Sequence, residues 1–352
     1  MHGTSVHDID DGNQLQGRHV RVFVYEHITG GGLIGQAIPP SLAHEGDIML
    51  RALVADLAEA GVEVVTTRDE RLASTDLPAH VENVGDTLQK DAVVEACLLE
   101  SDAVWPIAPE AGGVLEALSE QFAHNGRLLL GSRPSALRVA SSKLLTARRL
   151  SDLGVPVVPT FDPRQSIPPQ YSRWVLKPDD GAGCVGTRIV DGADELAQAI
   201  ADLDPAVECA VQPFVAGSAV SLSLLCREGR AALLACNRQR VAVVNDAFCL
   251  LGCVVNDAAV QGEYAAPLAA EIAAALPGLW GYVGVDLLLT HGGAQVLEVN
   301  PRLTLSYVGL SSSLGSNAAA LVLGLLDGDW PDPDVATHAV PVTVNLEVPY
   351  AP

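Results

Sequence analysis

Positive charge is scarce in this sequence. The 352 residues include 21 lysines and arginines against 43 aspartates and glutamates, which gives a formal net charge of −22 at pH 7. A strongly acidic chain repels nucleic acids and anionic membranes, which excludes nonspecific binding to either. Any anionic ligand has to be held by local groups of cationic side chains.

Long apolar runs and paired cysteines are also missing. The most apolar late segment, residues 318–326, is far shorter than the roughly 20 residues that span a bilayer, and we expect a core helix there. Residues 1–18 lack the apolar stretch of a signal peptide and are expected to form a flexible tail. Of the seven cysteines only Cys249 and Cys253 are close, a poor zinc pattern without a companion pair. These absences predict a cytoplasmic protein without nucleic-acid or membrane partners, and a homodimer is the commonest soluble assembly.

What the sequence does contain is a hairpin pattern with acidic side chains. Two apolar runs flank a turn at Gly292, which predicts a β-hairpin. A fold about this turn puts Asp286 opposite Glu298, and strand alternation puts Asn300 on the same face. Opposed carboxylates repel unless a cation lies between them, and carboxylate and amide oxygen atoms suit Mg²⁺ or Mn²⁺. Arg302 follows closely enough to meet a phosphate or a carboxylate. The alternative is a surface hairpin whose acidic residues face water.

A glycine-rich segment, residues 181–186, follows a predicted strand that contains Lys177. Its letters match the dinucleotide fingerprint, but that motif requires a following helix, and residues 187–190 are strand-like. A P-loop lacks support because no Lys-Ser/Thr follows, and a kinase loop is disfavoured because Lys177 precedes the glycines. We interpret the segment as a flap between antiparallel strands whose backbone amides approach phosphates. The alternative is a structural turn with a solvated lysine.

A second lysine lies in the first turn of a predicted helix, where Ser142 is the expected N-cap and Gly154 the stop. The positive charge of Lys143 opposes the helix dipole there, so a nearby anion accounts for it better than helix stability does. The simpler alternative is an exposed lysine. Further on, residues 212–217 form an extended linker between two strand patterns, which can offer backbone groups to an adenine edge.

The order of these parts resembles the ATP-grasp superfamily over about residues 20–310. The resemblance implies that ATP binds with Mg²⁺ or Mn²⁺, and that Lys177 and Arg302 act in catalysis. The implied ATP contacts are Lys143, Lys177, Gly181, Gly183, Gly186, Gln212, Pro213 and Val215, and the implied metal ligands are Asp286, Glu298 and Asn300. Many members carry a ribose-binding acid where this chain has Ser218 and Ala219, which leaves the sugar contact unassigned.

The implied fold is α/β, with α+β character in the middle domain. After the tail we expect an N-terminal open, mostly parallel sheet over residues 19–132, a small central flap domain over 133–211 and a C-terminal antiparallel-sheet domain over 212–352. Alternating strand and helix patterns support the first domain. The expected strands there are residues 19–25, 62–66, 103–107 and 128–131, and the expected helices are residues 47–60, 91–100 and 113–124.

Loops at the carboxyl ends of parallel strands are where substrates bind in open α/β sheets. A finer resemblance, to the tyramine–glutamate ligase group, is carried by residues 24–32, 108–110, 237–239 and 300–307. Together they suggest the substrate contacts Glu26, His27, Gly31, Glu110, Arg238, Ser306 and Tyr307. That group acts in methanofuran biosynthesis, and similar chains occur in bacteria that use methylofuran, so a cofactor-assembly ligase with glutamate as a substrate is expected.

The implied reaction joins a small-molecule carboxylate to an amine. The carboxylate attacks the γ-phosphate of ATP, and the amine displaces phosphate from the resulting acyl phosphate. No nucleophilic side chain is needed, and no Ser/His/Asp or Cys/His pattern here suggests one. The general base stays open between Glu26 and Glu110. The alternative functions are an ATP-dependent phosphotransferase and a non-catalytic ATP-binding protein.

Overall fold

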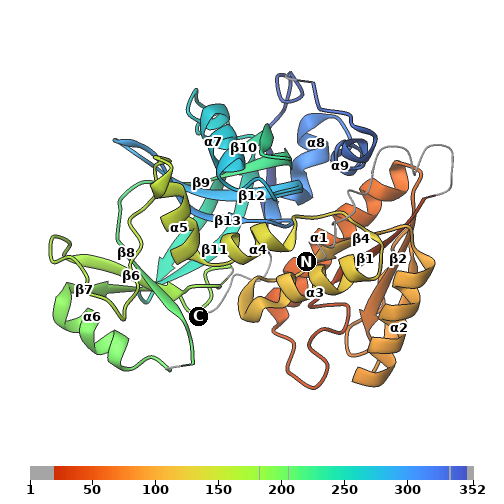
Figure 1. Ribbon diagram of the computed structural model, residues 1–352, viewed down its shortest axis with the longest axis horizontal. Helices are drawn as coiled ribbons and strands as arrows, with labels where there is room; N and C mark the ends of the chain where they lie inside the picture. The colour runs from red at the N-terminus through yellow and green to blue at the C-terminus, as the bar shows by residue number, and fades with distance from the viewer. Residues whose placement is uncertain (1–19, 182, 205, 333, 347–352) are drawn as a thin grey trace, which may run out of the picture.

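The computed structural model describes residues 20–346, except residues 182, 205 and 333. The predicted flexible tail at residues 1–18 lies outside the described residues. Figure 1 shows a parallel sheet with its helices at one end of the molecule, a small sheet with α6 at the other, and long antiparallel strands between them. The predicted α/β fold with a parallel and an antiparallel sheet is confirmed.

The first sheet is parallel and has the strand order β3-β2-β1-β4-β5. Its central strand is buried along most of its length, which explains the continuous apolar run at residues 22–25. The strands are β1 (Arg21–Glu26), β2 (Glu63–Asp69), β3 (His80–Val84), β4 (Ala103–Ile107) and β5 (Leu128–Leu129). The helices between them are α1 (Pro40–Glu59), α2 (Thr87–Glu100) and α3 (Val114–His124), the last preceded by η1 (Ala111–Gly113).

Two of these elements differ from the sequence prediction. Helix α1 begins at Pro40 rather than at residue 47, because proline is well suited to the first helical turn. Strand β3 was not predicted. It lies at the sheet edge and is mostly accessible, so its sequence HVENV carries little of the apolar pattern that marks a buried strand.

The second sheet has nine strands and is antiparallel, in the order β13-β12-β9-β10-β11-β7-β6-β8, with β14 also paired to β11. The strands of its long part are β9 (Ser218–Arg227), β10 (Arg230–Val244), β11 (Ala247–Val255), β12 (Gly281–Thr290), β13 (Gly293–Asn300) and β14 (Val342–Asn345). Helix α7 (Ala265–Ala275) packs on β9 and β10.

Strands β6 (Arg173–Pro178), β7 (Arg188–Asp191) and β8 (Cys209–Pro213) carry the glycine flap, with the unpredicted helix α6 (Gly192–Ala201) on them. They have their own small core, which includes Trp174 and Val211. They join the rest of the sheet where β7 meets β11, through the pair Arg188 and Ala247 and a hydrogen bond from the amide of Ile189 to the carbonyl oxygen of Asp246. Helices α4 (Pro134–Ala140) and α5 (Lys143–Asp152) lead into this part from the parallel sheet. The domain boundaries drawn at residues 133 and 212 stay predictions.

The C-terminal segment packs between the two sheets. It contains η2 (Leu305–Gly309), α8 (Leu310–Leu314), α9 (Ala318–Gly324) and η3 (Leu325–Asp327), and α1 packs against η2 and α9. The core helix expected at residues 318–326 is therefore observed. Among the residues that the structure describes, no single helix is long and apolar enough to cross a membrane, and only the pair 305–314 and 318–327, bent by 92°, meets that test by length and composition.

Candidate active site

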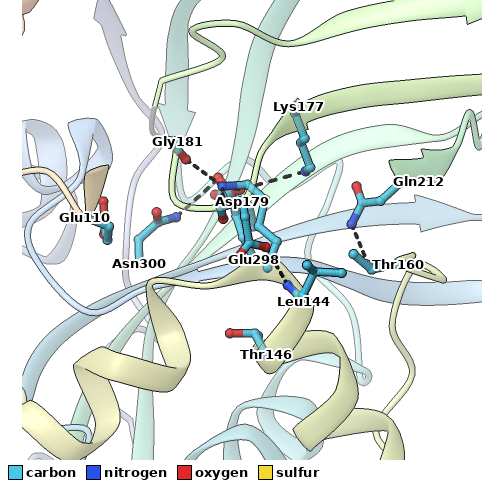
Figure 2. A network of polar contacts seen from close by, with 12 residues as sticks. Glu110, Leu144, Thr146, Thr160, Lys177, Asp179, Gly181, Gln212, Glu298 and Asn300 are labelled. Carbon is cyan, nitrogen blue, oxygen red and sulfur yellow. Dashed lines mark hydrogen bonds and ion pairs between the residues drawn. The ribbon is translucent and has the colours of Figure 1, made fainter. Parts of the chain in front are cut away.

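The acidic hairpin forms as the alternation pattern predicts. Asp286 on β12 pairs directly with Glu298 on β13, and a register shift follows between Asp286 and Leu287. The side-chain amide of Asn300 donates a hydrogen bond from Nδ2 to Oδ2 of Asp286 over 3.3 Å. Carboxylate, carboxylate and amide thus lie on one face of the hairpin, where Asn300 is buried and the two acids are half-buried. Figure 2 shows Glu298 and Asn300.

Both predicted lysines reach this hairpin from other elements. The Nζ atom of Lys143 lies 3.2 Å from Oε2 of Glu298, and Nζ of Lys177 lies 3.9 Å from the same oxygen. Lys143 is in the first turn of α5, where the Ser142 hydroxyl accepts a hydrogen bond from the amide of Leu145 as an N-cap. Lys177 projects from β6 (Figure 2). Both are buried, which contradicts the alternative of solvated lysines.

The titratable groups in this cluster shift one another's pKa values. Burial raises the pKa of Asp286, and the neighbouring charge of Glu298 raises it further. Burial also acts to raise the pKa of Glu298, but the positive charges of Lys143 and Lys177 outweigh it, so the pKa of Glu298 is lowered. Burial lowers the pKa of Lys177 despite the attraction of Glu298. The two carboxyl groups therefore compete for a proton, and their environments favour its binding to Asp286.

This arrangement fits a hard divalent cation. A cation between Asp286 and Glu298 would displace this proton, and the two carboxylates with the amide oxygen of Asn300 are ligands of the kind that Mg²⁺ and Mn²⁺ prefer. Within the described part of the chain, no group of three or more His, Cys, Asp or Glu side chains is arranged to hold a metal ion. The coordination sphere would have to be completed by Asn300, by water or by phosphate oxygens.

The base of the flap is tied to the start of α5. The ammonium group of Lys143 donates hydrogen bonds to the carbonyl oxygens of Gly181, at 2.6 Å, and Asp179, at 3.2 Å. The Asp179 carboxylate in turn accepts a hydrogen bond from the amide of Leu144 over 2.8 Å (Figure 2). The anion beside Lys143 is thus Glu298, whereas Asp179, a residue that sequence analysis missed, offers Lys143 a carbonyl oxygen and binds the start of α5 with its carboxylate.

The rest of the flap is a turn with left-handed backbone. Gly183, Cys184 and Gly186 have φ angles of 63°, 65° and 68°. Such angles favour glycine and leave backbone groups open to close approach. At the start of the flap, Oδ2 of Asp180 accepts a hydrogen bond from the amide of Gly112 over 2.7 Å. The flap therefore contacts both α5 and the loop that follows β4.

The predicted adenine hinge lies at the end of β8. Gln212 is buried, and its Nε2 donates to Oγ1 of Thr160 over 2.9 Å (Figure 2). Pro213 ends the strand, opposite Trp174 of β6, and Val215 lies in the linker to β9. The hinge is on the strand next to the one that carries Lys177.

Arg302 is bound by a protein carboxylate. Its guanidinium group makes three hydrogen bonds of 2.9–3.0 Å to both oxygens of Glu110, and Nη1 donates to the carbonyl oxygen of Leu303. Both side chains are nearly buried. The pair links the end of β13 to the loop after β4. Because both oxygens of Glu110 already accept hydrogen bonds, it is a poor candidate for the general base.

Glu26 and its neighbours brace the loop after β1. The Glu26 carboxyl group accepts hydrogen bonds from the amides of Ile28 and Thr29 and from the Thr29 hydroxyl. Burial raises its pKa, although those hydrogen bonds oppose the shift. Burial also lowers the pKa of His27 to about 4, and Gly31 takes a turn conformation with φ of 96°. Neither His27 nor Gly31 lines the cavities at the hairpin.

Arg238 points away from the hairpin, and its neighbour takes the expected place. Strand alternation directs Arg238 to Asp257 on the half-exposed side of β10. Gln239 faces the other way, and its Nε2 donates to Oδ1 of Asp286 over 2.9 Å. Gln239 therefore positions one of the two acids. The polar run at residues 237–240 indicated that a side chain from this strand reaches the site. Choosing Gln239 rather than Arg238 required knowing which residues of β10 face the hairpin.

Ser306 and Tyr307 also have different environments. The Ser306 hydroxyl lines the hairpin cavity and belongs to a buried cluster of hydroxyl groups with Tyr282 and Thr304. Tyr307 is buried beneath α1, where its hydroxyl donates to Asp56 over 2.9 Å. Ser306 thus lies at the hairpin cavity, whereas Tyr307 attaches the C-terminal segment to α1.

Two cavities adjoin at this site. The first, of about 100 Å³, is polar and includes all three residues of the acidic hairpin. The second, of about 80 Å³, lies against α1 and is mainly apolar. Both are lined by Glu45, Gly183 and Arg302. A larger cavity of about 930 Å³ on the outer side of α5 does not include the hairpin acids, so we assign the chemistry to the smaller pair.

Comparisons with known proteins agree with this geometry. Residues 140–306 match the family model of the ATP-grasp domain, and residues 62–137 match that of the pre ATP-grasp 3 domain. A curated relative, tyramine–L-glutamate ligase from Methanocaldococcus jannaschii, is 26% identical over 207 residues, which span 59% of this chain and 58% of the relative's length.

Solved structures show the same fold. A crystal structure from Archaeoglobus fulgidus assigned to the ATP-grasp superfamily superposes with a TM-score of 0.68 at 25% identity, covering 87% of this chain and 88% of the other. L-amino acid ligase from Bacillus licheniformis superposes with a TM-score of 0.63 at 17% identity, covering 88% of this chain and 74% of the other. At that identity the second likeness concerns the fold alone.

Proposed function

Since this chain belongs to the ATP-grasp family, we propose that it is an ATP-dependent ligase that joins a carboxylate to an amine. The observation that carries the proposal is the convergence of Asp286, Glu298 and Asn300 with Lys143 and Lys177 beneath a glycine flap. An arrangement of two acids, an amide and two ammonium groups matches a metal-bound triphosphate in charge and in ligand type.

The residues have separate parts in this proposal. Asp286, Glu298 and Asn300 would hold Mg²⁺ or Mn²⁺, which supplies charge neutralisation for the transferred phosphoryl group. Lys143 and Lys177 would exchange their contacts with Glu298 for phosphate oxygens. The flap would exclude water from the reacting groups, which protects an acyl phosphate from hydrolysis.

The chemistry proceeds in two steps. A substrate carboxylate oxygen attacks the γ-phosphorus of ATP, a new P–O bond forms, and ADP leaves with the electrons of the broken bond. An amine nitrogen then attacks the acyl carbon, and inorganic phosphate leaves as the amide forms. Positioning and charge stabilisation account for the catalysis, without a covalent bond to the protein.

For the substrates, the name of the curated relative suggests glutamate as the acid and tyramine as the amine. We extend this pair to the present chain as a proposal, together with a place in the assembly of a methylofuran-type one-carbon carrier. The partial match to that relative makes the pair a starting point for assays, because fold and family do not fix substrate choice.

An ADP-release assay with L-glutamate and tyramine tests the proposal. A ligase releases ADP and phosphate only when acid, amine and Mg²⁺ are all present. A phosphotransferase releases ADP with one acceptor and leaves a stable phosphorylated product, and a non-catalytic protein binds ATP without releasing ADP. If a panel of acids and amines gives either of these two results, the ligase proposal is wrong.

A further inference from the structure

The second cavity has an apolar wall and an acidic edge. Its lining includes apolar side chains from the loop after β1, from α1 and from the end of β4. These residues are Ile28, Leu42, Met49, Ile107, Ala108 and Pro109. A concave apolar surface next to a reaction centre suits the hydrocarbon part of a small ligand.

Helix α1 approaches this wall closely because it carries a glycine. Gly46 lies inside the helix, where glycine is unfavourable for helix stability. A Cβ atom at Gly46 would lie 2.7–2.8 Å from the carboxyl group of Glu26, so no larger residue fits without displacement. Close packing between α1 and Glu26 thus explains the glycine. It also places the preceding residue, Glu45, at the junction of the two cavities.

Two acids line the apolar cavity, and their environments differ. Glu26 is buried, accepts three hydrogen bonds from its own loop, and has a raised pKa because of burial. Glu45 is only half-buried and lines both cavities. Its charge acts on Arg302 and Cys184, both of which also line the hairpin cavity. Glu45 is therefore the acid that a ligand lying across the junction would meet.

We propose that the apolar cavity holds the hydrocarbon part of the amine substrate and that Glu45 binds its ammonium group. The ligand class is a primary amine on a small ring or alkyl chain. The cavity lies beside the polar cavity in which the acid would be activated, so the nitrogen of a bound amine faces the acyl carbon. This inference rests on the proposed ligase function, and it assigns to Glu45 the role that sequence analysis left open between Glu26 and Glu110.

The proton transfers balance as follows. The ammonium group gives one proton to the Glu45 carboxylate, and the freed lone pair forms the C–N bond. The C–O bond to the phosphoryl group breaks, and its electron pair leaves on inorganic phosphate. A second proton on the nitrogen passes to the leaving phosphate, which yields a neutral amide.

Direct binding tests the subsite without turnover. Calorimetric titration of the Mg²⁺–ADP-loaded protein with phenethylamine and with 2-phenylethanol compares ligands that differ in the ammonium group. We expect the wild type to prefer the amine, and Glu45→Gln to weaken amine binding roughly tenfold, as expected for loss of a charged hydrogen-bond partner. Glu59→Gln, the same change on the exposed end of α1, is the matched control and should bind as the wild type does.

Steady-state kinetics with L-glutamate, tyramine and methylamine add a second readout. Glu45→Gln should raise KM for tyramine while leaving KM for glutamate and ATP unchanged. Leu42→Phe, which fills the apolar cavity, should raise KM for tyramine but not for methylamine. Equal amine binding by the wild type and Glu45→Gln would overturn the inference.

The two proposals can fail separately. If the protein binds phenethylamine through Glu45 but forms no amide, the subsite is supported and the ligase function is wrong. If amide forms and Glu45→Gln leaves KM for tyramine unchanged, the ligase function is supported and the subsite is wrong.

Discussion

The hairpin acids and the Glu110–Arg302 pair are both buried acid–base groups, yet their charges are arranged in different ways. Glu110 and Arg302 carry opposite charges and are joined by three hydrogen bonds. Asp286 and Glu298 face each other, compete for a proton and lie beside two lysines, of which Lys177 has its pKa lowered by burial. A balanced pair, in which opposite charges are matched by hydrogen bonds, holds elements together. An unbalanced cluster, in which two carboxyl groups compete for a proton, is ready to exchange its contacts for a ligand.

The largest expected effect is a loss of turnover when the unbalanced cluster is changed at Glu298. Glu298→Gln keeps the shape of the side chain but removes the charge that attracts both lysines and a cation. We expect turnover to fall by at least about 10³-fold, the scale of losing a principal electrostatic contact in a reaction centre. ADP release measures the loss, and an unchanged far-UV circular dichroism spectrum shows that the fold persists. Turnover within tenfold of the wild type would contradict the metal assignment.

Substitutions in the balanced pair, Glu110 and Arg302, should change the free energy of unfolding. Glu110→Gln removes the carboxylate that is hydrogen-bonded to the Arg302 guanidinium, and we expect a loss of about 3–5 kcal/mol in the free energy of unfolding, measured with urea. Replacing both residues, as in Glu110→Gln with Arg302→Met, should restore much of that stability because no unpaired charge is left. If the double variant is as unstable as the single one, the pair does not act as a balanced unit.

The pH dependence of stability also distinguishes the hairpin acids from the Glu110–Arg302 pair. The pKa of Asp286 is raised in the folded state by burial and by Glu298. Its contribution to stability is therefore present below its unfolded pKa of about 4 and is lost as pH rises through the folded pKa. In chelator, stability should fall on this account as pH rises toward neutrality. Asp286→Asn should remove that part of the slope in urea unfolding curves, and an unchanged slope would contradict the raised pKa.

A smaller effect is expected at the residue that orients Asp286. Gln239→Leu removes the hydrogen bond to Oδ1 and should weaken Mn²⁺ binding about tenfold, the low end for loss of a group that orients a metal ligand. Arg238→Leu on the opposite face of β10 is the matched control and should leave Mn²⁺ affinity unchanged. Equal effects of the two substitutions would show that the face of β10 on which a residue lies does not determine its effect on Mn²⁺ binding.

The smallest effect concerns the flap. Asp180→Asn weakens one exposed hydrogen bond to Gly112, so we expect KM for ATP to rise by no more than about tenfold, the scale of a single hydrogen bond. Asp194→Asn, an exposed acid in the first turn of α6, is the control. A larger change in KM would mean that the flap depends on this contact for closure.

Much of the local geometry could be predicted from the sequence. The register of Asp286 with Glu298 follows from strand alternation about a glycine turn, and the helix start at Lys143 follows from its serine cap. Both depend on residues close in the chain, where patterns are strong. The roles inferred for these residues stay predictions.

Contacts between distant segments could not be predicted in this way. Glu110 and Arg302 lie 192 residues apart, and nothing in their local sequences indicates a pairing. The choice between Arg238 and Gln239 required the phase of β10, which a one-residue shift reverses. The junction at Glu45 depends on how closely α1 packs against β1, which no periodicity encodes.

The short connection between β7 and β11 affects how the site can open. The far end of β11 pairs with β14 at residues 252–255, and β7 meets β11 at its opposite end, where Arg188 pairs with Ala247. Rotation of β6, β7 and β8 about this connection breaks few backbone hydrogen bonds, so it meets little resistance. We expect β6, β7 and β8 to turn outward as a unit about this connection once the hydrogen bonds of Lys143 to Asp179 and Gly181 are broken, which would carry Lys177 away from the acidic hairpin.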